Sequence, residues 1–420
     1  MRTDPELEKV RSMRGKDEVL APGVLKIERS MAVAGPSGVV VTGEGLVVVD
    51  TGMPQEGSDR VHRIREHTHA PFHTIIYSHG HGDHVGGVHA FIEDNRKRGF
   101  ARPRIIGHEL VTQRFDKYRM LAGRRSYIGM LQFPTQEMLE RSEGPTQGRR
   151  TYDYVYPDTT FTHDFKFKLG GFTFQLFHAP AETDDTIWVW VPERKLAMVG
   201  DLLIGGCPNT GNPLKEQRYT LEWAQALEKI AEKKPEFIIA GMGALRGKTA
   251  VERCQKTAAL LRYLHEEVVR KLNEGKWIEQ ILAEIKLPEE MAEDPWLQGN
   301  YGHPVFVIHD VYRRYTGWYD GNPSELFPSP STDIAAEVLA LAPPQQLLDH
   351  ARQLQAAGNA QLALHLSDLV IKGSADAARR KEAMLLKAEL LENRALAVGN
   401  FIAGNIMRTS AALLRQEASG

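Results

Sequence analysis

The sequence predicts a layered α/β domain followed by an all-helical region, and two observations carry this expectation. From about residue 23 to about residue 247, short apolar runs of strand length alternate with amphipathic segments of helix length. After that point strand-like runs disappear, and the rest of the sequence has the periodicity of helices. Because a single hydrophobic core stops growing near about 250 to 300 residues, the 420 residues are expected to form more than one domain.

The first half contains continuous apolar runs that are typical of strands buried on both faces. The clearest are "GLVVVD" at 45–50, "HTIIYSH" at 73–79 and "RPRIIGH" at 102–108, with helix-like segments at about 56–68 and 86–100 between them. This βαβ succession implies neighbouring strands in a layered domain. Functional sites in such domains lie beyond the carboxyl ends of the strands.

A long insertion and a second series of strands complete the first half. Residues 109–155 look irregular or loosely helical, and insertions of this kind often cover active sites. The segment "KLGGFTFQLF" predicts a hairpin that turns at Gly170 and Gly171. Two apolar strands follow within 186–201, and 220–241 reads as an amphipathic helix and a last buried strand.

The second half is predicted to be helical, with a Pro/Gly-rich interruption at 315–331. Helical pairs at 344–372 and 376–397, joined by Gly373 and Ser374, resemble tandem helix-turn-helix repeats. One such unit cannot bury its own apolar face, so it is expected to stack on a neighbour or on another subunit.

Composition narrows the partners and the compartment. Lys and Arg total 52 against 54 Asp and Glu, without a long run of one sign, which argues against nucleic acid or an anionic membrane as partner. Small or neutral partners fit better. The two cysteines, Cys207 and Cys254, are too few for a disulfide framework, and the N-terminus is charged where a secretory signal is apolar. A cytoplasmic location is therefore expected. No apolar stretch reaches the roughly 18 residues of a membrane span.

The segment "YSHGHGDHVGG" at 77–87 concentrates metal-ligand side chains at the end of a predicted strand. His79 and His81 lie two positions apart, and Asp83 and His84 follow at once. Imidazole and carboxylate are ligands that zinc accepts, and four donors within six residues can serve two adjacent ions. The alternative is a solvated polar loop, or a single histidine that caps a helix. The density of donors at a strand end favours the metal site.

Later strand ends offer the further ligands that a metal site needs. The segment "FHAPAETDDT" places four donors after the strand "FTFQLF": His178, Glu182, Asp184 and Asp185. The segment "AMVGD" places Asp201 at the end of another apolar strand. A carboxylate in such a position is expected to meet a cation, with a helix or turn cap as the alternative.

These segments together resemble the metallo-β-lactamase superfamily. "HGHGDHVGG" matches its HxHxDH motif, and "VVVDTG" and "AMVGD" match its flanking strand motifs. "GWYDGNPSEL" resembles a signature in the dimerisation region of alkyl sulfatases, and the similarity extends over residues 23–415. The resemblance implies an αββα sandwich at 1–250, with the 109–155 insertion over a binuclear metal centre. It also implies an all-α helical dimerisation domain at 251–420.

The resemblance also implies a set of ligands. Alkyl sulfatases use glutamate where most of the superfamily has a histidine ligand on the middle hairpin. Aligning "PAET" with that turn makes Glu182 the ligand. His178 is then expected to lie next to the ligands without binding the ion. The implied ligands are His79, His81 and Glu182 for one ion, Asp83 and His84 for the other, and Asp201 as the bridge. Asp83 and Asp201 are the expected catalytic residues.

The sequence departs from the family at the second ion. After the strand "PEFIIAG" the family normally supplies a last histidine, whereas this chain has Met242 and no histidine in that segment. The second ion is therefore expected to be weakly held, completed by water, or served by His303 or His309.

Positions that hold or contact sulfate in the sulfatases also differ. The arginine after the bridging ligand falls near Pro213, although Arg218 is close by, and a later histidine falls near Phe306, with His303 and His309 on either side. The substrate-binding candidates are Tyr127 of the insertion, Arg218, Phe306, His303 and His309.

The expected function is a metal-dependent hydrolase in which a water held between the ions attacks a hydrophobic small-molecule ester. Zinc is the first choice, and three carboxylates in the implied ligand set leave iron or manganese open. The resemblance implies an alkyl sulfate, and a carboxylic ester, thioester, lactone or activated aryl ether ranks nearly level.

Two other functions are compatible with the same donors. The site could instead be a structural metal site in a non-catalytic scaffold, or the iron centre of a dioxygenase on the same fold. Metal content and oxygen consumption separate these functions from hydrolysis. The helical half is expected to pair two subunits, as a homodimer or higher oligomer or with a homologous subunit. The sterol-carrier-like domain of long alkyl sulfatases is expected to be missing.

Overall fold

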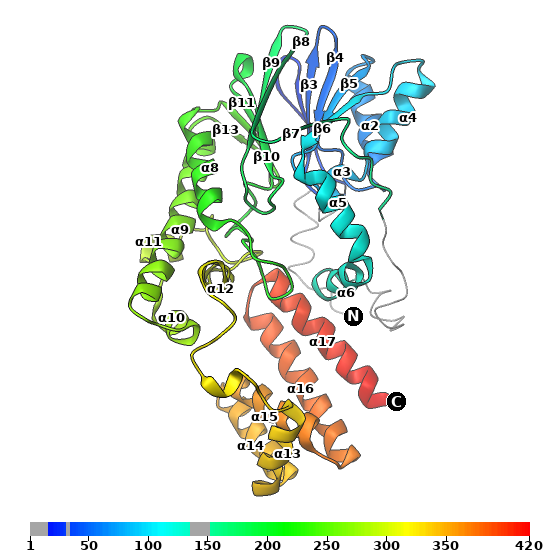
Figure 1. Ribbon diagram of the computed structural model, residues 1–420. Helices are drawn as coiled ribbons and strands as arrows, with labels where there is room; N and C mark the ends of the chain where they lie inside the picture. The colour runs from blue at the N-terminus through cyan, green and yellow to red at the C-terminus, as the bar shows by residue number, and fades with distance from the viewer. Residues whose placement is uncertain (1–15, 31–33, 135–151) are drawn as a thin grey trace.

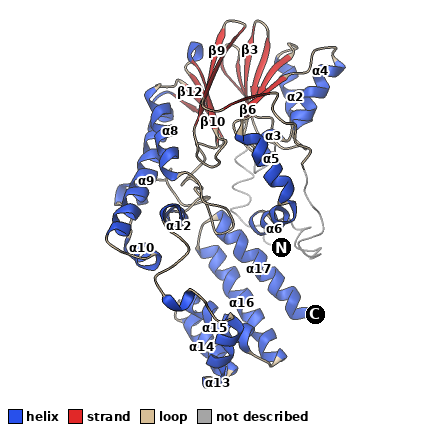
Figure 2. Cartoon of the chain, in the orientation of Figure 1, coloured by secondary structure: helices blue, strands red, loops and turns tan. Residues whose placement is uncertain are grey.

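The computed structural model describes residues 16–30, 34–134 and 152–420. Two mixed β-sheets stack face to face with helices on their outer faces, and a helical region lies beyond one edge of the sandwich (Figure 1). Figure 2 shows that the strands are confined to the sandwich and that the last third of the chain is helical. The predicted αββα layers followed by a helical region are confirmed.

The first sheet holds the strands of the first 161 residues, in sequence order. They are β1 (Glu18–Ala21), β2 (Val24–Ile27), β3 (Ser37–Thr42), β4 (Gly45–Val49), β5 (Phe72–Ile76), β6 (Arg104–His108) and β7 (Thr159–Phe161). β1 to β4 pair antiparallel, and β4 to β7 pair parallel. Helices α2 (Gly57–His67) and α4 (Val88–Lys97) connect the parallel strands and cover the outer face (Figure 1).

The second sheet has the order β13–β12–β11–β10–β9–β8. Its strands are β8 (Asp164–Leu169), β9 (Phe172–His178), β10 (Ile187–Val191), β11 (Leu196–Gly200), β12 (Phe237–Ala240) and β13 (Gly243–Arg246). The hairpin predicted at Gly170 and Gly171 joins β8 to β9, and both glycines have positive φ. A short 3₁₀ turn, η1 (Pro192–Arg194), joins β10 to β11. Strand β13 was not predicted, because the four residues that form it have no apolar run.

The two sheets bury a common apolar core between them. Val47 and Ile76 of the first sheet and Leu176, Val189 and Ile239 of the second belong to it, each 0 to 3% exposed. The outer faces of both sheets are buried too, so every residue of β4 and β10 is buried. This two-sided burial explains why the strands read as continuous apolar runs.

The insertion predicted at 109–155 begins with two regular helices. These are α5 (Leu110–Met120) and α6 (Ala122–Gln132), which lie beyond the edge of the sandwich (Figure 1). Residues 135–151 of the insertion lie outside the described residues. The loose apolar periodicity of this stretch hid its helical order, because α6 packs on the distant C-terminal helix α17 (Phe401–Ser419) and not on a sheet.

The helical region begins within the sandwich and ends in a bundle. Its elements are α8 (Thr220–Glu232), α9 (Gly247–Asn273), α10 (Ile278–Glu284), α11 (Glu289–Ala292), α12 (Pro304–Tyr315), η2 (Pro323–Glu325), α13 (Ser331–Leu341), α14 (Pro344–Ala356), α15 (Ala360–Gly373), α16 (Ala377–Ala397) and α17. Helices α8, α9 and α12 pack on the second sheet. Among the described residues, none of the helices has the length and apolar character of a membrane span.

The expected helical repeats are only partly as predicted. Residues 344–372 form the helical pair α14 and α15, but 376–397 is the single helix α16. Its partner is α17, which packs along it in an antiparallel hairpin (Figure 1). The prediction was wrong there, because the apolar periodicity of "MLLKAELLENRALA" at 384–397 continues without a turn signal.

Candidate metal centre

The segment that carries the clustered histidines follows β5 and is fixed to the end of β4 through Asp50. The backbone N and the hydroxyl of Ser78 donate hydrogen bonds to the two carboxylate oxygens of Asp50, at 2.8 and 2.7 Å. Asp50 itself has a φ of +62°, a conformation that only aspartate, asparagine and glycine adopt readily. The "VVVDTG" segment thus ends β4 in a turn that directs the carboxylate of Asp50 toward the end of β5.

The glycines between the donors are required by close packing. A Cβ on Gly80 would lie 2.9 Å from Asp185 Oδ2, and a Cβ on Gly82 would lie 2.9 Å from the ring of Tyr152. After Gly82 the short helix α3 (Gly82–Val85) presents Asp83 and His84 on the same side as the preceding histidines. The spacing of the motif therefore reflects the tight packing around its glycines as well as the placement of its metal-ligand side chains.

The first donor group consists of His79, His81 and Glu182. His79 Nε2 and His81 Nδ1 lie 2.8 Å apart, and Glu182 Oε2 lies 3.9 Å from each of them. Glu182 comes from the loop between β9 and β10, so the group joins the two sheets. One ligand atom from each residue lies within 4.8 Å of the others, a spacing that a single ion can span.

The second donor group is arranged around His84. His84 Nε2 lies 3.3 Å from Asp201 Oδ1 and 3.7 Å from Asp83 Oδ2. His79, His84 and Asp201 also place ligand atoms within 4.8 Å of one another. His79 therefore lies between the two groups.

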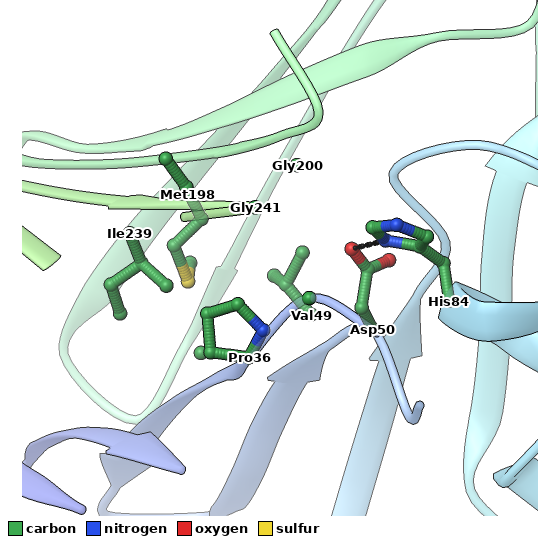
Figure 3. A pocket seen from close by; sticks show the side chains of 11 residues that line it. Pro36, Val49, Asp50, His84, Met198, Gly200, Ile239 and Gly241 are labelled. Atoms are coloured by element: carbon green, nitrogen blue, oxygen red, sulfur yellow. Dashed lines mark hydrogen bonds and ion pairs between the residues drawn. The ribbon is translucent and has the colours of Figure 1, made fainter. Parts of the chain in front are cut away.

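The hydrogen bonding of His84 leaves one nitrogen free for a ligand. Its Nδ1 lies 2.7 Å from Asp50 Oδ2, so with an ionised Asp50 this nitrogen carries the proton (Figure 3). Its Nε2 is buried and has no hydrogen-bond partner. A histidine that donates one N–H to a carboxylate and points its second nitrogen at other metal-ligand groups has the arrangement of metal-binding histidines. The residues present therefore fit a metal ion.

Burial sets the protonation of the histidines. It lowers the pKa of His79 to about 3 and lowers the pKa of His81 well below its usual value. Both rings are neutral at neutral pH, as metal ligation requires. Burial also disfavours the charged form of His84, but the carboxylates of Asp201, Asp50 and Asp83 outweigh it and raise its pKa. A divalent cation would replace that proton as the charge that these carboxylates surround.

Arg218 holds the carboxylate of the first donor group. Its Nη1 donates to Glu182 Oε1 at 2.5 Å and also to the carbonyl of Asn209, and its backbone N donates to Asp310 at 2.6 Å. Burial opposes ionisation of Glu182, but the charge of Arg218 dominates and lowers the pKa of this carboxyl. Arg218 was expected to contact the substrate, whereas the structure places it on Glu182.

A further shell of contacts fixes the segments that carry the ligands. Asp185 accepts hydrogen bonds from Gly80 N at 2.8 Å and from Arg114 Nε at 2.9 Å. His178 Nε2 donates to the carbonyl of Asp184 at 2.6 Å, and its ring stacks on His108. His178 therefore lies behind the hairpin and outside both donor groups. Neither Arg114 nor His108 carried a sequence signal for this role.

The remaining predicted residues lie away from the donor groups. Tyr127 is half-buried on α6, and Phe306 is half-buried on α12. His303 caps α12 by accepting a hydrogen bond from Val305 N, and His309 is exposed on the same helix. Within the described part of the chain, none of them joins a group of metal-ligand atoms.

No histidine follows β12, and the backbone there closes on the second donor group. A Cβ on Gly241 would lie 2.3 Å from Asp201 Oδ1, so only glycine leaves this carboxylate in place. Met242 packs against the core of the second sheet. The donors of the second group therefore come from α3 and from the end of β11.

A small cavity lies beside Asp50 and His84 (Figure 3). It is also lined by Gly35, Pro36, Met198 and Ile239, and its volume of about 10 Å³ suits a single water. It is too small for an organic substrate.

Two residues near the donors were missed by the sequence reasoning. Lys215 and Tyr301 are half-buried, and the charges of Glu182 and Asp83 act on both of them. Tyr301 belongs to a loop whose carbonyls accept hydrogen bonds from Asn400 Nδ2, at the start of α17. Nothing in the local sequence signals either position, since both depend on contacts between distant segments.

Comparison with known families agrees with this geometry. Residues 31–241 match the metallo-beta-lactamase superfamily, and residues 277–417 match the alkyl sulfatase dimerisation family. The first match contains both donor groups. The second contains α10 to α16 and most of α17.

Similar proteins include sulfatases and an ether-cleaving enzyme. A linear primary-alkylsulfatase of Pseudomonas sp. (strain ATCC 19151) is 26% identical over 332 residues, which are 76% of this chain and 62% of the relative. The 2,4-dinitroanisole O-demethylase subunit alpha of Nocardioides sp. (strain JS1661) is 28% identical over 213 residues, 46% of this chain and 56% of the relative. The chain thus spans less than two thirds of the length of these proteins.

A solved structure shares the whole arrangement. The stereoselective inverting sec-alkylsulfatase of Pseudomonas sp. superimposes with a TM-score of 0.82 at 21% identity, covering 96% of this chain and 66% of that protein. At this identity the likeness establishes the fold.

Proposed function

The chain belongs to the metallo-beta-lactamase superfamily, and from this premise we propose that it is a metal-dependent hydrolase of hydrophobic sulfate esters. The observation that carries the proposal is the convergence of two donor groups on His79, with the buried Nε2 of His84 aimed at the donors without a hydrogen-bond partner. The relatives named as alkylsulfatases supply the substrate class.

In this proposal His79, His81 and Glu182 would hold a first ion and Asp83 and His84 a second, with Asp201 shared between the two. A divalent ion bound there would lower the pKa of a water ligand to about 7 and would stabilise charge on the oxygen under attack or on the leaving oxygen. The imidazoles favour zinc, and the share of carboxylates leaves iron or manganese as alternatives.

The chain's own residues hold this site in register. Asp50 fixes the proton of His84 on Nδ1, Arg218 fixes the free carboxylate oxygen of Glu182, and Asp185 fixes the backbone at Gly80. The overall reaction adds one water to an alkyl sulfate and yields an alcohol, a sulfate ion and a proton. Preorganised ligands of this kind spare the reaction the cost of reorganising them.

The remaining parts of the site are assigned to substrate binding. Tyr127 on α6 and Phe306 on α12 are proposed to contact the alkyl chain, with His303 and His309 at its far end. Cleavage of an activated aryl ether is the second candidate, because one relative is named as a 2,4-dinitroanisole O-demethylase subunit.

The dimerisation region suggests a pair of subunits. Trp318, Phe327 and Leu341 are 75%, 95% and 90% exposed, and all three lie within the segment that matches the dimerisation family. Large apolar side chains gathered in one exposed segment are typical of a protein interface. We propose that they are covered in a homodimer, or by a homologous subunit.

The test is metal analysis combined with a substrate screen on the purified full-length protein. We expect up to two ions per chain and chelator-sensitive release of sulfate from dodecyl sulfate. Release of dinitrophenol from dinitroanisole without sulfate release would select the aryl ether instead. Carboxylic esters, thioesters and lactones complete the screen. One inert ion with no turnover would favour the scaffold, and oxygen consumption with bound iron would favour the dioxygenase.

A further inference from the structure

Two cations beside the candidate metal centre have no anionic partner. The ammonium of Lys215, in the loop between β11 and α8, makes no hydrogen bond or ion pair with any described residue. The guanidinium of Arg125 on α6 lies 3.2 Å above the ring of Tyr118, and it has no carboxylate partner in the described part of the chain. Both side chains are half-buried.

The positions of these cations border the first donor group. The ring of Tyr118 lies nearly parallel to that of His81, with ring centres 6.3 Å apart and planes 10° apart. Arg125, Tyr118 and His81 therefore form a layered series that leads from the cation to the ligands. Lys215 is close enough to feel the charges of Arg125 and Arg218 as well as those of Glu182 and Asp83.

The carboxylates near Lys215 are already engaged with other cations. Glu182 pairs with Arg218, and the neighbouring Glu216 pairs with Lys117. Asp184 and Asp185 both pair with Arg114. Asp83 also acts on Lys215, but burial raises the pKa of this carboxyl to about 6 and its ion-pair contact is with His84. Among the described residues, no carboxylate forms an ion pair with Lys215.

Keeping such a charge costs stability. Burial lowers the pKa of Lys215 to about 8, and the positive charges of Arg218 and Arg125 act in the same direction. Taking an ammonium out of water without a partner is unfavourable. A cation held in this way next to a candidate active site is explained if a ligand supplies the missing anion.

We propose that Lys215, with Arg125 beside it, binds the anionic group of the substrate next to the metal ligands. The inference rests on the proposed function in that the anion would be the sulfate of the ester. The ammonium offers three N–H donors on a flexible stem, so it can follow the sulfate oxygens from substrate to product. Arg218 is less free to move with the anion, because its Nη1 is held by Glu182 and by the carbonyl of Asn209.

The test compares Lys215→Met with Lys117→Met in the metal-loaded full-length protein. Lys117 is a matched control, since it lies near the same loop but is paired with Glu216. We expect Lys215→Met to weaken the binding of inorganic sulfate, measured by calorimetry, by about tenfold or more. KM for dodecyl sulfate should rise by a similar factor while kcat changes little. Lys117→Met should leave both values unchanged.

A third variant separates folding from binding. Lys215→Arg retains the charge and should recover most of the sulfate affinity, and circular dichroism and metal content should match the wild type in all variants. Equal sulfate affinity in Lys215→Met and wild type would overturn the inference, even if sulfate esters are hydrolysed. Loss of sulfate binding in Lys215→Met, in a protein that fails to hydrolyse sulfate esters, would retain the anion site and reject the proposed reaction.

Discussion

The two halves of the candidate metal centre are built differently, although most of their donors come from one short segment. The half around Glu182 has three donors from two sheets, and a buried arginine fixes its carboxylate. The half around His84 has carboxylates that lie 3.3 and 3.7 Å from the imidazole nitrogen, and Gly241 stands where a further side chain would collide with Asp201. The carboxylate of the first half is therefore held by a buried cation, whereas the carboxylates of the second half are partly exposed.

Because of this difference, we expect the two halves to bind their ions with unequal affinities. A site whose ligands are already fixed by hydrogen bonds loses less freedom when the ion binds. The second half is fixed at His84 through Asp50, but Asp83 and Asp201 are partly exposed, and among the described residues neither is paired with an arginine as Glu182 is. We therefore expect the second ion to exchange first when a chelator is added.

The largest effect is expected from His79, which belongs to both groups. In His79→Ala, metal content should fall below one ion per chain and activity should drop by at least about a thousandfold, or about 4 kcal/mol of transition-state stabilisation. His73→Ala is the control, because His73 lies on β5, the strand that leads to His79, and has an exposed side chain. Two retained ions in His79→Ala would show that the groups do not share this residue.

Glu182→Gln should affect the first half selectively. Mutating a residue that only hydrogen-bonds to a ligand typically lowers metal affinity by about 10- to 100-fold. Loss of a ligand itself should lower it further. The melting temperature should also fall, because Arg218 would then be buried beside a neutral side chain. Titration with zinc, followed by metal analysis, measures the loss. Glu216→Gln, at an exposed carboxylate, is the control, and equal zinc affinity in both variants would contradict the assignment of Glu182.

Asp50→Asn should affect the second half and leave the first almost intact. Asparagine tolerates the positive φ of this position, so the fold should persist, but the amide cannot orient His84 as the carboxylate does. We expect the affinity for the second ion to fall by about 10- to 100-fold. Competition with a chromogenic chelator resolves the two ions. A parallel loss of both ions would show that the two halves are not independent.

How far these features could be predicted depends on how local their causes are. His79, His81, Asp83 and His84 lie in one segment, so their convergence follows from a strand end and a turn. Glu182 and Asp201 required the further assumption that distant strand ends meet. Both donor groups were therefore within reach of the sequence, although their service as ligands stays a prediction.

The surroundings of the ligands could not be predicted in the same way. The helix α6 is held by Asn405 of α17, whose Nδ2 donates to the carbonyl of Gln132. Asn212, in the loop of Lys215, donates to the side chain of the same Gln132. Three segments far apart in the sequence thus contact one another at one buried glutamine, and no periodicity in the sequence predicts such a contact.

The smallest expected effect concerns pH, and it tests whether the cations serve the first half of the site. Arg125, Arg218, Glu182 and Asp83 are the charged groups that act on Lys215, and burial lowers its pKa to about 8. The ammonium is therefore charged below that pH and neutral above it. Sulfate inhibition should weaken as pH rises through about 8, by at most about tenfold for each pH unit. In Lys215→Arg the positive charge persists, so sulfate inhibition measured from about pH 6.5 to about pH 9.5 should stay level. An equal decline in both proteins would assign the titration to another group and would separate Lys215 from the anion.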